Sequence, residues 1–259
     1  MLPHSNMDIF MSIDLNSDDN LFKFYPFSEF SEAVLRDKEV FFSHRENFND
    51  VYENHFGLNW DGLEMQPAVK AELERQLFES PERVATFCLT SNFDETLMWA
   101  HYAVNHTGFC VVFSKKALEN ISSYRHISST DSIETTGRVI QGHVEYKETP
   151  PIIQMESVYE RAMDEKKGSW GDELIQKILY TKSIHWQYEK EFRIVLVVKD
   201  KHSGVLVRVP DEAIKGIIFG AKTKDEDRVK TMAAHPHLSF YKANMMRAEY
   251  RIVPLPLPN

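Results

Sequence analysis

The chain has 259 residues, 42% of them hydrophobic and 27% charged, as is typical of a globular protein long enough to form one large domain. Its 30 Lys and Arg stand against 39 Asp and Glu, and the net charge of −9 excludes a uniformly basic nucleic-acid-binding surface. A nucleic acid could bind only through a local cleft. No signal peptide or long apolar run is recognisable, so no membrane partner and a cytoplasmic location are predicted. Cys88 and Cys110 lie in apolar runs, which predicts buried free thiols.

Apolar periodicity and turn residues divide the chain into short elements. Residues 1–20 are predicted to be a poorly ordered acidic arm, residues 21–253 a single domain with a surface excursion around 114–143, and residues 254–259 an extended tail. Strands are predicted at 21–27, 39–44, 83–90, 108–113, 143–147, 191–198 and 205–210, and helices at 28–40, 67–79 and 91–106 and in two stretches of 151–183. The strands at 191–198 and 205–210 are predicted to form a hairpin. The fold class is therefore α+β, with a mixed, largely antiparallel sheet and flanking helices.

Three local signals set the expected helix ends. Ser28 or Ser31 is suited to begin the helix at 28–40. Asn92 and Glu95 have the spacing of a capping box, which predicts the start of the helix at 91–106. Gly108 is predicted to end that helix.

Several motifs occur in an order that resembles a known bacterial family. They are "FKFYPF", "VFFSHRENFNDVYE", "LMWAHYAVNHTGFCVVF", "VEYK", "KSIHWQYEKEFRIV" and "IKGIIFGAKT", between Leu21 and Lys222. The chain is similar in these motifs to the domain of unknown function 2971 family. The resemblance implies a bacterial intracellular protein of a kind often found near mobile elements and defence genes, and it carries no activity to transfer.

The segment "YEKEFR" is the strongest candidate for chemistry. Side chains alternate across a strand, so Glu189, Glu191 and Arg193 are predicted to share one face. Two neighbouring carboxylates repel each other, so the pKa of at least one of them rises unless the charge of Arg193 or Lys182 offsets the repulsion. The segment is therefore either an ion-paired strand entry or part of a functional cleft.

Glu-x-Glu at the head of a strand also resembles the third motif of ADP-ribosyltransferases, in which a Glu stabilises an oxocarbenium-like transition state. In those enzymes a cation or His comes first, and a Ser/Thr or Tyr motif precedes the Glu. Matching residues occur here in that order: Lys23, Tyr25, His44 or Arg45, then Thr90, Ser91 or Tyr102, then Glu189 and Glu191. The resemblance implies NAD as a substrate and an ADP-ribosyltransferase-like fold.

The helix at 91–106 concentrates aromatic and imidazole groups. Trp99 and Tyr102 serve either the hydrophobic core or stacking on a nicotinamide or adenine ring. His101 is either a buried imidazole that donates to Asp94 or a polar group that faces a ligand. His101 and His106 are five residues apart, which is unsuitable for two metal ligands on one helical face, and no metal is predicted.

The turn "NFND" has two interpretations as well. Asn47, Asn49 and Asp50 are favoured as residues that stabilise a turn through side-chain-to-backbone hydrogen bonds. Alternatively, this turn receives a phosphate or ribose.

Two rival functions remain open. Glu145-x-Lys147, with Asp131 upstream, has the form of half of a Mg-dependent nuclease motif, although such pairs are common by chance. The other rival is a non-enzymatic recognition module of a defence system, in which these polar residues are structural.

The main hypothesis is an NAD-dependent ADP-ribosyltransferase or NAD glycohydrolase that acts as an effector in a bacterial defence or toxin system, on an unidentified macromolecular acceptor or on water. The catalytic candidates are Glu191, Glu189, His101 and Tyr102, and the candidates for nucleotide binding are Lys23, Tyr25, Asn49, Asp50, Trp99 and Arg193.

Overall fold

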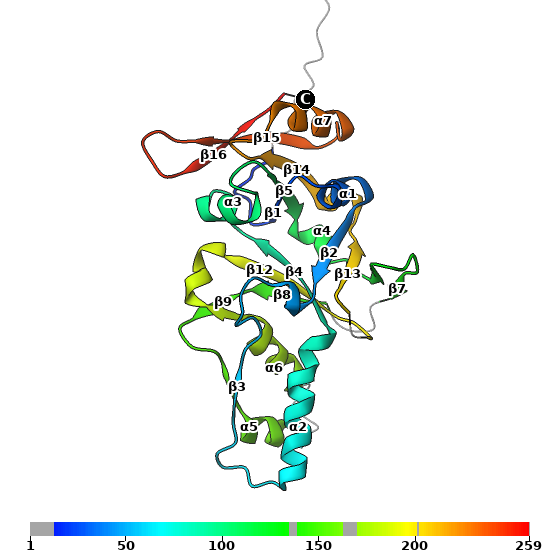
Figure 1. Cartoon of the computed structure of the whole chain (residues 1–259), viewed down its shortest axis with the longest axis vertical. Coiled ribbons are helices and arrows are strands. Elements are labelled where there is room, and N and C mark those ends of the chain that lie inside the picture. The colour runs from blue at the N-terminus through cyan, green and yellow to red at the C-terminus, as the bar shows by residue number, and fades with distance from the viewer. Residues whose placement is uncertain (1–12, 135–138, 163–169, 201, 259) are drawn as a thin grey trace, which may run out of the picture.

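A 12-stranded mixed sheet runs through the molecule in this computed structural model, which describes residues 13–134, 139–162, 170–200 and 202–258 (Figure 1). The chain is a single α+β domain with helices that flank a mostly antiparallel sheet. The strands of this sheet are β1 (Asn20–Tyr25), β2 (Glu39–Ser43), β4 (Val84–Thr90), β5 (Phe109–Ser114), β6 (Ser123–His126), β7 (Ile133–Glu134), β8 (Ile140–His143), β12 (Glu191–Val197), β13 (Gly204–Arg208), β14 (Ile214–Phe219), β15 (Ser239–Met245) and β16 (Ile252–Pro256). Only the β14–β15 pair among them is parallel in the described part of the chain.

The sheet divides at β4. One edge of β4 pairs along its whole length with β12. The other edge pairs with β2 at Thr86 and with β1 at Thr90, so β1 and β2 leave β4 in different directions. The edge of β4 between these two contacts is left without a neighbouring strand, and a cavity lies in this opening.

The predicted hairpin of residues 191–210 is wrong. β12 pairs with β4 and β8, whereas β13 pairs with β2 and β6. β4 and β2 therefore lie between two strands that are consecutive in this part of the sequence. Short sequence separation favours a hairpin, but both strands are largely buried and find partners on both edges inside the sheet.

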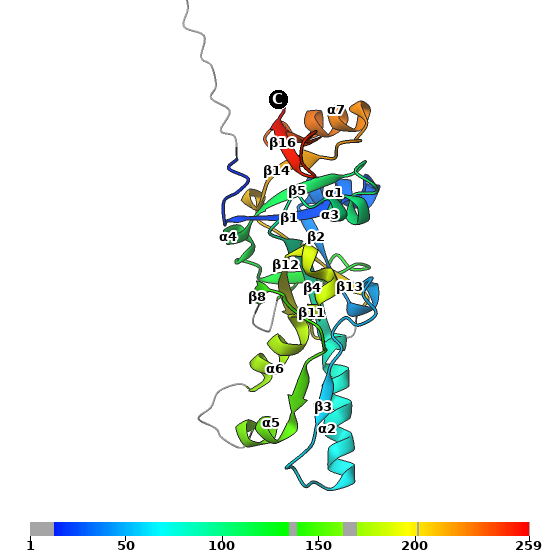
Figure 2. The ribbon, with the colours of Figure 1, turned by 90° about the vertical axis from the view of Figure 1, so that its left-hand side faces the viewer.

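The helices and short strands complete the domain. The helices are α1 (Glu29–Asp37), α2 (Pro67–Glu79), α3 (Thr96–Tyr102), α4 (Lys115–Leu118), α5 (Met155–Ala162), α6 (Trp170–Leu179) and α7 (Asp225–Ala234). The 3-10 turns are η1 (Arg45–Asn47), η2 (Ser80–Arg83), η3 (Ile184–Glu189) and η4 (Asp211–Ala213). Two further pairs of parallel strands are β3 (Gly57–Asn59) with β10 (Ile152–Gln154), and β9 (Glu145–Lys147) with β11 (Thr181–Ser183). α2, α5, α6 and β3 form a lobe that extends from one end of the large sheet (Figures 1 and 2).

Alternation along β1 explains the two main hydrophobic clusters. Leu21 and Tyr25 belong to the cluster on one face of the sheet, which also receives Val34 of α1. Phe22 and Phe24 point to the other face and pack with α3. A third cluster fills the lobe around α2 and α6. Lys23 lies between Leu21 and Tyr25 in the alternation, so a cation occupies a position on the apolar face of the strand.

Most local predictions in the first half of the chain agree with the structure. α2 has the predicted bounds, and Ser28 begins α1 with a capping box that includes Ser31. The predicted capping box of α3 is wrong, because Glu95 itself is the N-cap and its carboxylate accepts from the backbone N–H of Leu97. Asn92 instead accepts from the N–H of Asp94 in the preceding turn.

The segment boundaries can now be compared with the prediction. Residues 1–12 of the expected acidic arm lie outside the described residues, whereas residues 13–19 form turns in which Leu15 is buried. The expected surface excursion at 114–143 contains α4, β6, β7 and β8, and Leu118 and Tyr124 are buried in the core. Residues 254–256 of the expected tail belong to strand β16. Among the described residues, no helix combines the length and apolarity needed to cross a membrane.

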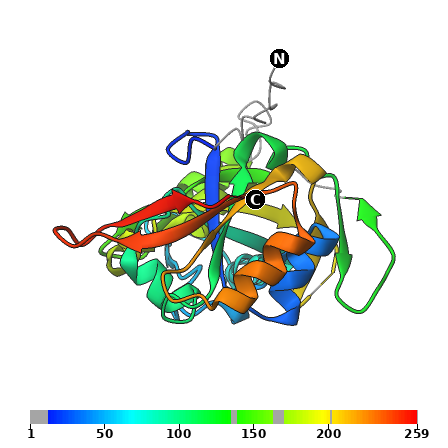
Figure 3. The ribbon, with the colours of Figure 1, turned by 90° about the horizontal axis from the view of Figure 1, so that it is seen from above.

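The β15–β16 hairpin projects from the body of the domain at one edge of the sheet (Figures 1 and 3). The N–H of Leu257 donates inward to Phe240, so by alternation Pro254 and Pro256 face the open edge. Proline has no N–H group, and these residues therefore oppose pairing of β16 with a further strand.

Gly108 joins the end of the α3 turn to β5, where an added Cβ would lie 2.1 Å from the backbone oxygen of Tyr25. We expect Gly108→Ala to lower the free energy of unfolding by about 2 kcal/mol or more, because β1 and β5 would have to separate. The matched control is Gly57→Ala, whose Cβ would meet only Ile152 at 3.8 Å and should change stability little. Urea unfolding curves of the two variants measure the difference, and equal stabilities would contradict the packing described for Gly108.

Candidate functional site

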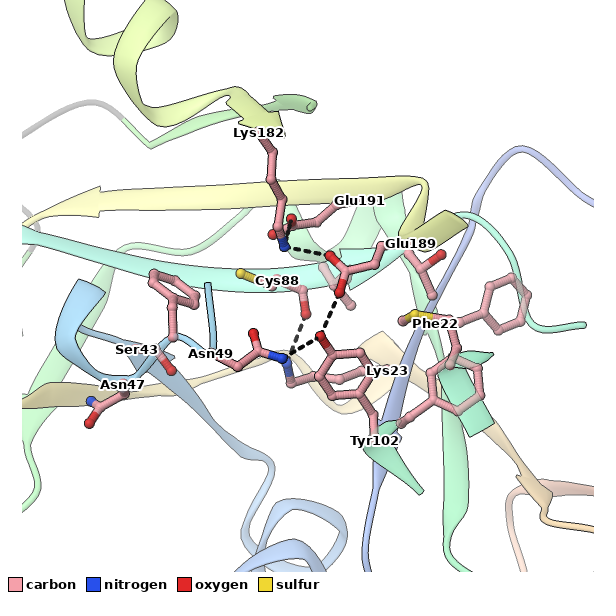
Figure 4. A pocket seen from close by; sticks show the side chains of 15 residues that line it. Phe22, Lys23, Ser43, Asn47, Asn49, Cys88, Tyr102, Lys182, Glu189 and Glu191 are labelled. Atoms are coloured by element: carbon pink, nitrogen blue, oxygen red, sulfur yellow. Dashed lines mark hydrogen bonds and ion pairs between the residues drawn. The ribbon is translucent and has the colours of Figure 1, made fainter. Parts of the chain in front are cut away.

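A cavity of about 270 Å³ occupies the opening of the sheet between β1 and β2 (Figure 4). Its lining combines apolar side chains, from Phe22, Phe24, Phe48, Leu89 and Met98, with polar ones, from Lys23, Ser43, Asn47, Asn49, Thr90, Tyr102, Lys182, Glu189 and Glu191, and Cys88. Residues from both faces of the sheet contribute, because the cavity lies where the sheet is interrupted. Five predicted site residues thus meet in one cavity: Lys23, Asn49, Tyr102, Glu189 and Glu191.

Lys23 reaches the open edge of β4. Its ammonium donates to the Cys88 carbonyl at 2.8 Å, which has no strand partner at this point of the sheet. The rings of Phe87 and Tyr25 lie 5.0 Å and 5.9 Å from the ammonium. Lys23 therefore satisfies a backbone carbonyl that the division of the sheet leaves open.

Glu189 and Glu191 reach the cavity in a different way from the prediction. Glu191 is the first residue of β12, but Glu189 is the last residue of η3. Lys190 between them has a left-handed backbone with φ of 42°, and this turn brings the two carboxylates to the same side. Both are 4% exposed, so their charges are removed from water and require partners inside the protein.

A buried network of ion pairs supplies these partners. Lys182 lies 2.5 Å from Glu189 and 3.1 Å from Glu191. Arg193 donates to both oxygens of Glu191, at 2.8 and 3.0 Å, and to both oxygens of Glu53, at 2.6 and 3.0 Å. The repulsion between the two carboxylates was predicted to be compensated by Arg193 or Lys182. In the structure both cations contribute.

The network favours the charged forms of Glu191, Lys182 and Arg193. Burial raises the pKa of Glu191, but the charges of Arg193 and Lys182 outweigh burial and keep this pKa below its usual range. Burial lowers the pKa of Lys182, yet Glu191 and Glu189 raise it overall. Burial raises the pKa of Glu53, and both of its oxygens nevertheless accept from Arg193, which has no acceptor atom. That geometry is the geometry of an ionised carboxylate.

Tyr102 connects α3 with the acidic groups. Its hydroxyl donates to Glu189 at 2.5 Å and accepts from the Asn49 amide at 3.1 Å. Burial raises the pKa of Tyr102, and the Glu189 charge raises it further, so the phenol keeps its proton. Tyr102 is the last residue of α3, and the following turn contains three consecutive left-handed residues, Val104 to His106. This turn is closed by hydrogen bonds from Asn105 and His106 back to α3 carbonyls.

The other predicted residues lie outside the cavity lining. Trp99 is fully buried, donates to the Phe93 carbonyl and packs edge-on against Phe24. Tyr25 is in the core and stacks on Phe109. Asp50 accepts from the N–H of Tyr52 within a turn. His101 is exposed on the outer side of α3 near Tyr188, and Arg193 lies behind Glu191.

Three residues of the site were missed or undervalued by the sequence analysis. Glu53 lies 140 residues before Arg193, and no periodicity connects the two. Cys88 was interpreted as a core thiol, but it lines the cavity and its carbonyl binds Lys23. Phe48 lies between the two asparagines of "NFND", and its position in that motif was the available signal.

The residues of the nuclease half-motif lie outside the cavity lining. Glu145 and Lys147 are exposed on the short strand β9 and pair with each other at 2.8 Å. Asp131 is also exposed, in the segment between β6 and β7. In the described part of the chain, no group of three or more His, Cys, Asp or Glu side chains is placed to hold a metal ion.

Two histidines support the turn that carries Asn47 and Asn49. His44 is buried and accepts from the Glu46 N–H at the start of η1. The His202 ring lies 5.2 Å from the His44 ring, and Glu82 is 3.7 Å from His44. The Asn47 amide also donates to the Ser203 carbonyl, which fixes the turn to the segment before β13.

Comparison with known families places this site in context. Residues 98–194 match the family described as protein of unknown function (DUF2971). This part of the chain is a DUF2971 domain. The matched residues run from α3 to β12 and include Tyr102, Lys182, Glu189 and Glu191, whereas Lys23 and Asn49 lie outside them. No curated protein and no solved structure matches the chain.

Removing one charge of the network should be strongly destabilising. Glu191→Gln removes the carboxylate that accepts from both Lys182 and Arg193, so two buried cations each lose a charged partner, and we expect the free energy of unfolding to fall by about 3–5 kcal/mol. The control is Glu39→Gln, because Glu39 pairs with Arg125 at a more exposed position and its loss should have an effect of about 1 kcal/mol or less. Urea unfolding measures both changes. A loss for Glu191→Gln as small as for Glu39→Gln would contradict the network.

His202 makes stability depend on pH. Burial and the neighbouring His44 lower its pKa from 6.5 to about 4, with a smaller contribution from His126 and an opposing one from Glu82. The unfolded chain therefore binds a proton at His202 between pH 6.5 and 4 that the folded chain does not bind, so the stabilisation present above pH 6.5 is lost as the pH falls towards 4. We expect His202→Asn to reduce this loss by about 1–3 kcal/mol. Unfolding at several pH values gives the measurement, and parallel curves for the two proteins would refute the assignment.

Proposed function

We propose that the cavity is the active site of an enzyme that cleaves the N-glycosidic bond of NAD and transfers ADP-ribose to water or to a macromolecule. The observation that carries this proposal is the convergence of the buried Glu189 carboxylate, the Tyr102 phenol and the Lys23 ammonium on one partly apolar cavity. Perturbed ionisable groups in a cavity are typical of catalytic sites. The motif order of ADP-ribosyltransferases supports the choice of reaction.

Glu189 is better suited than Glu191 to face the ligand. A carboxylate can accept about four hydrogen bonds. Within the described residues, Glu191 takes three from Lys182 and Arg193, whereas Glu189 takes one on each oxygen, from Tyr102 and Lys182. Glu189 therefore keeps acceptor positions for a ribose hydroxyl or for an oxocarbenium-like transition state. Glu191 would hold Lys182 in place.

The size and lining of the cavity fit one half of a dinucleotide. Its volume of about 270 Å³ is at the low end for small-molecule sites, so the nicotinamide ribose would enter and the adenosine would remain outside. Phe22, Phe24 and Phe48 supply aromatic surface for the nicotinamide ring. Tyr102 would contact the ribose rather than stack on a base, because its hydroxyl points to Glu189.

The reaction needs no cofactor besides NAD. The bond between C1′ of the ribose and the ring nitrogen breaks, and nicotinamide leaves with the bonding electron pair. A water oxygen or an acceptor nucleophile forms the new bond to C1′ and releases one proton. Glu189 would stabilise the positive charge that develops on the ribose. In the cell we place this activity in a bacterial defence or toxin system.

The direct test is nicotinamide release from NAD by the full chain, with water, protein and nucleic acid offered as acceptors. We expect Glu189→Gln to reduce the rate at least about 100-fold, because an electrostatic contribution to the transition state is lost. Glu39→Gln, which removes a carboxylate far from the cavity, should keep the wild-type rate.

Two outcomes would overturn the proposal. One is the absence of nicotinamide release from the wild-type chain with every acceptor, which would leave the recognition module as the better description. The other is a wild-type rate for Glu189→Gln, provided that circular dichroism shows that the variant is folded. Nuclease activity is not favoured, since Glu145 and Lys147 pair with each other on the surface.

A further inference from the structure

The charges around the cavity sum to zero but are separated in space. The carboxylates of Glu53, Glu189 and Glu191 balance the cations of Lys23, Lys182 and Arg193. Five of these six groups form one continuous ion-paired network on the β12 side. That network contains three carboxylates and two cations, so it carries one net negative charge. The sixth group, Lys23, carries the compensating positive charge from β1.

Lys23 is the cation that remains open to a ligand. An ammonium has three N–H donors, and among the described residues the Cys88 carbonyl is the one acceptor that the ammonium binds. The Phe87 and Tyr25 rings lie beside the ammonium and offer no hydrogen-bonding oxygen or nitrogen at their faces. Lys23 lines the cavity, as Asn49 and Tyr102 also do (Figure 4).

The negative charge of Glu189 and the positive charge of Lys23 come from segments on opposite edges of β4. Glu189 presents its open acceptor positions beside β12, while Lys23 extends from β1. Both strands pair with Thr90 of β4, so they lie about two strand spacings, roughly 10 Å, apart. The cavity between them is therefore negative at the Glu189 wall and positive at the Lys23 wall.

A ligand that carries a cationic group at one end and an anionic group at the other fits this arrangement, because each of its charges meets a protein group of opposite charge. We infer that the site recognises a zwitterionic N-glycoside, with a cationic pyridinium ring at Glu189 and a phosphate at Lys23. This inference rests on the proposed function and names the substrate class of the same site. The inference predicts that the site binds ligands with an uncharged, reduced ring more weakly. It also predicts weaker binding of a nucleoside that lacks the phosphate.

Three ligands test the contributions of the ring cation and of the phosphate separately. Nicotinamide mononucleotide carries both charges, nicotinamide riboside carries only the ring cation, and reduced nicotinamide mononucleotide carries only the phosphate. We expect the full chain to bind the mononucleotide at least about tenfold more tightly than either of the others, as measured by calorimetry, because each lost contact involves a charged group.

Variants assign each preference to a residue. Lys23→Gln removes the charge but keeps a donor for the Cys88 carbonyl, and it should abolish the preference for the mononucleotide over the riboside. Glu189→Gln should abolish the preference for the oxidised over the reduced ring. Each preference is a ratio measured within one protein, so a general loss of stability does not imitate the effect. Lys38→Met, which changes a buried lysine outside the cavity, should keep both ratios.

The outcomes distinguish this inference from the proposed function. If NAD is cleaved but the wild-type chain binds all three probes equally, or if Lys23→Gln keeps the phosphate preference, the inference fails and the proposed function stands. If no probe binds and NAD is not cleaved, both fail. If both preferences are present and each variant removes one of them, the substrate class is supported even where the acceptor is unknown.

Discussion

The buried ion-pair network around Arg193 is the interaction on which the rest of the site depends. Arg193 joins Glu53, in the segment after η1, to Glu191 at the head of β12, and Lys182 extends the network to Glu189. Each charge is removed from water, so each is tolerated only because its partner is held within hydrogen-bonding distance. This mutual dependence fixes the segment around Glu53 and the segment from Lys182 to Arg193, which are distant in the sequence, in one geometry.

The opening in the sheet is the second constraint. A continuous ladder would place a strand along the whole edge of β4, whereas β2 and β1 pair only with its two ends, at Thr86 and Thr90. The carbonyl left between them needs a donor, and Lys23 provides one. A structural requirement of the backbone thereby places an ammonium at the cavity wall, where the same group is available to a ligand.

Local sequence patterns predicted much of the fold. The apolar runs of β4 and β5 and the capping residues of α1 are signals between near neighbours, and such signals act through backbone conformation alone. The pairing of β12 with β4 instead of β13 is a different matter, since it depends on which apolar edges meet in the folded chain. Similarly, the position of Trp99 in the core instead of the cavity follows from the direction in which α3 packs.

The sequence by itself determined the α+β class, the positions of most elements and the candidate residues Lys23, Tyr102, Glu189 and Glu191, because strand and helix periodicity and charged motifs are local properties. Only the tertiary structure decided that these residues share one cavity, that Lys182 and Arg193 pair with Glu53, Glu189 and Glu191, and that Glu189 rather than Glu191 keeps open acceptor positions. The physical reason is that the balance of buried charge is set by distances between segments up to 140 residues apart, which no local pattern records.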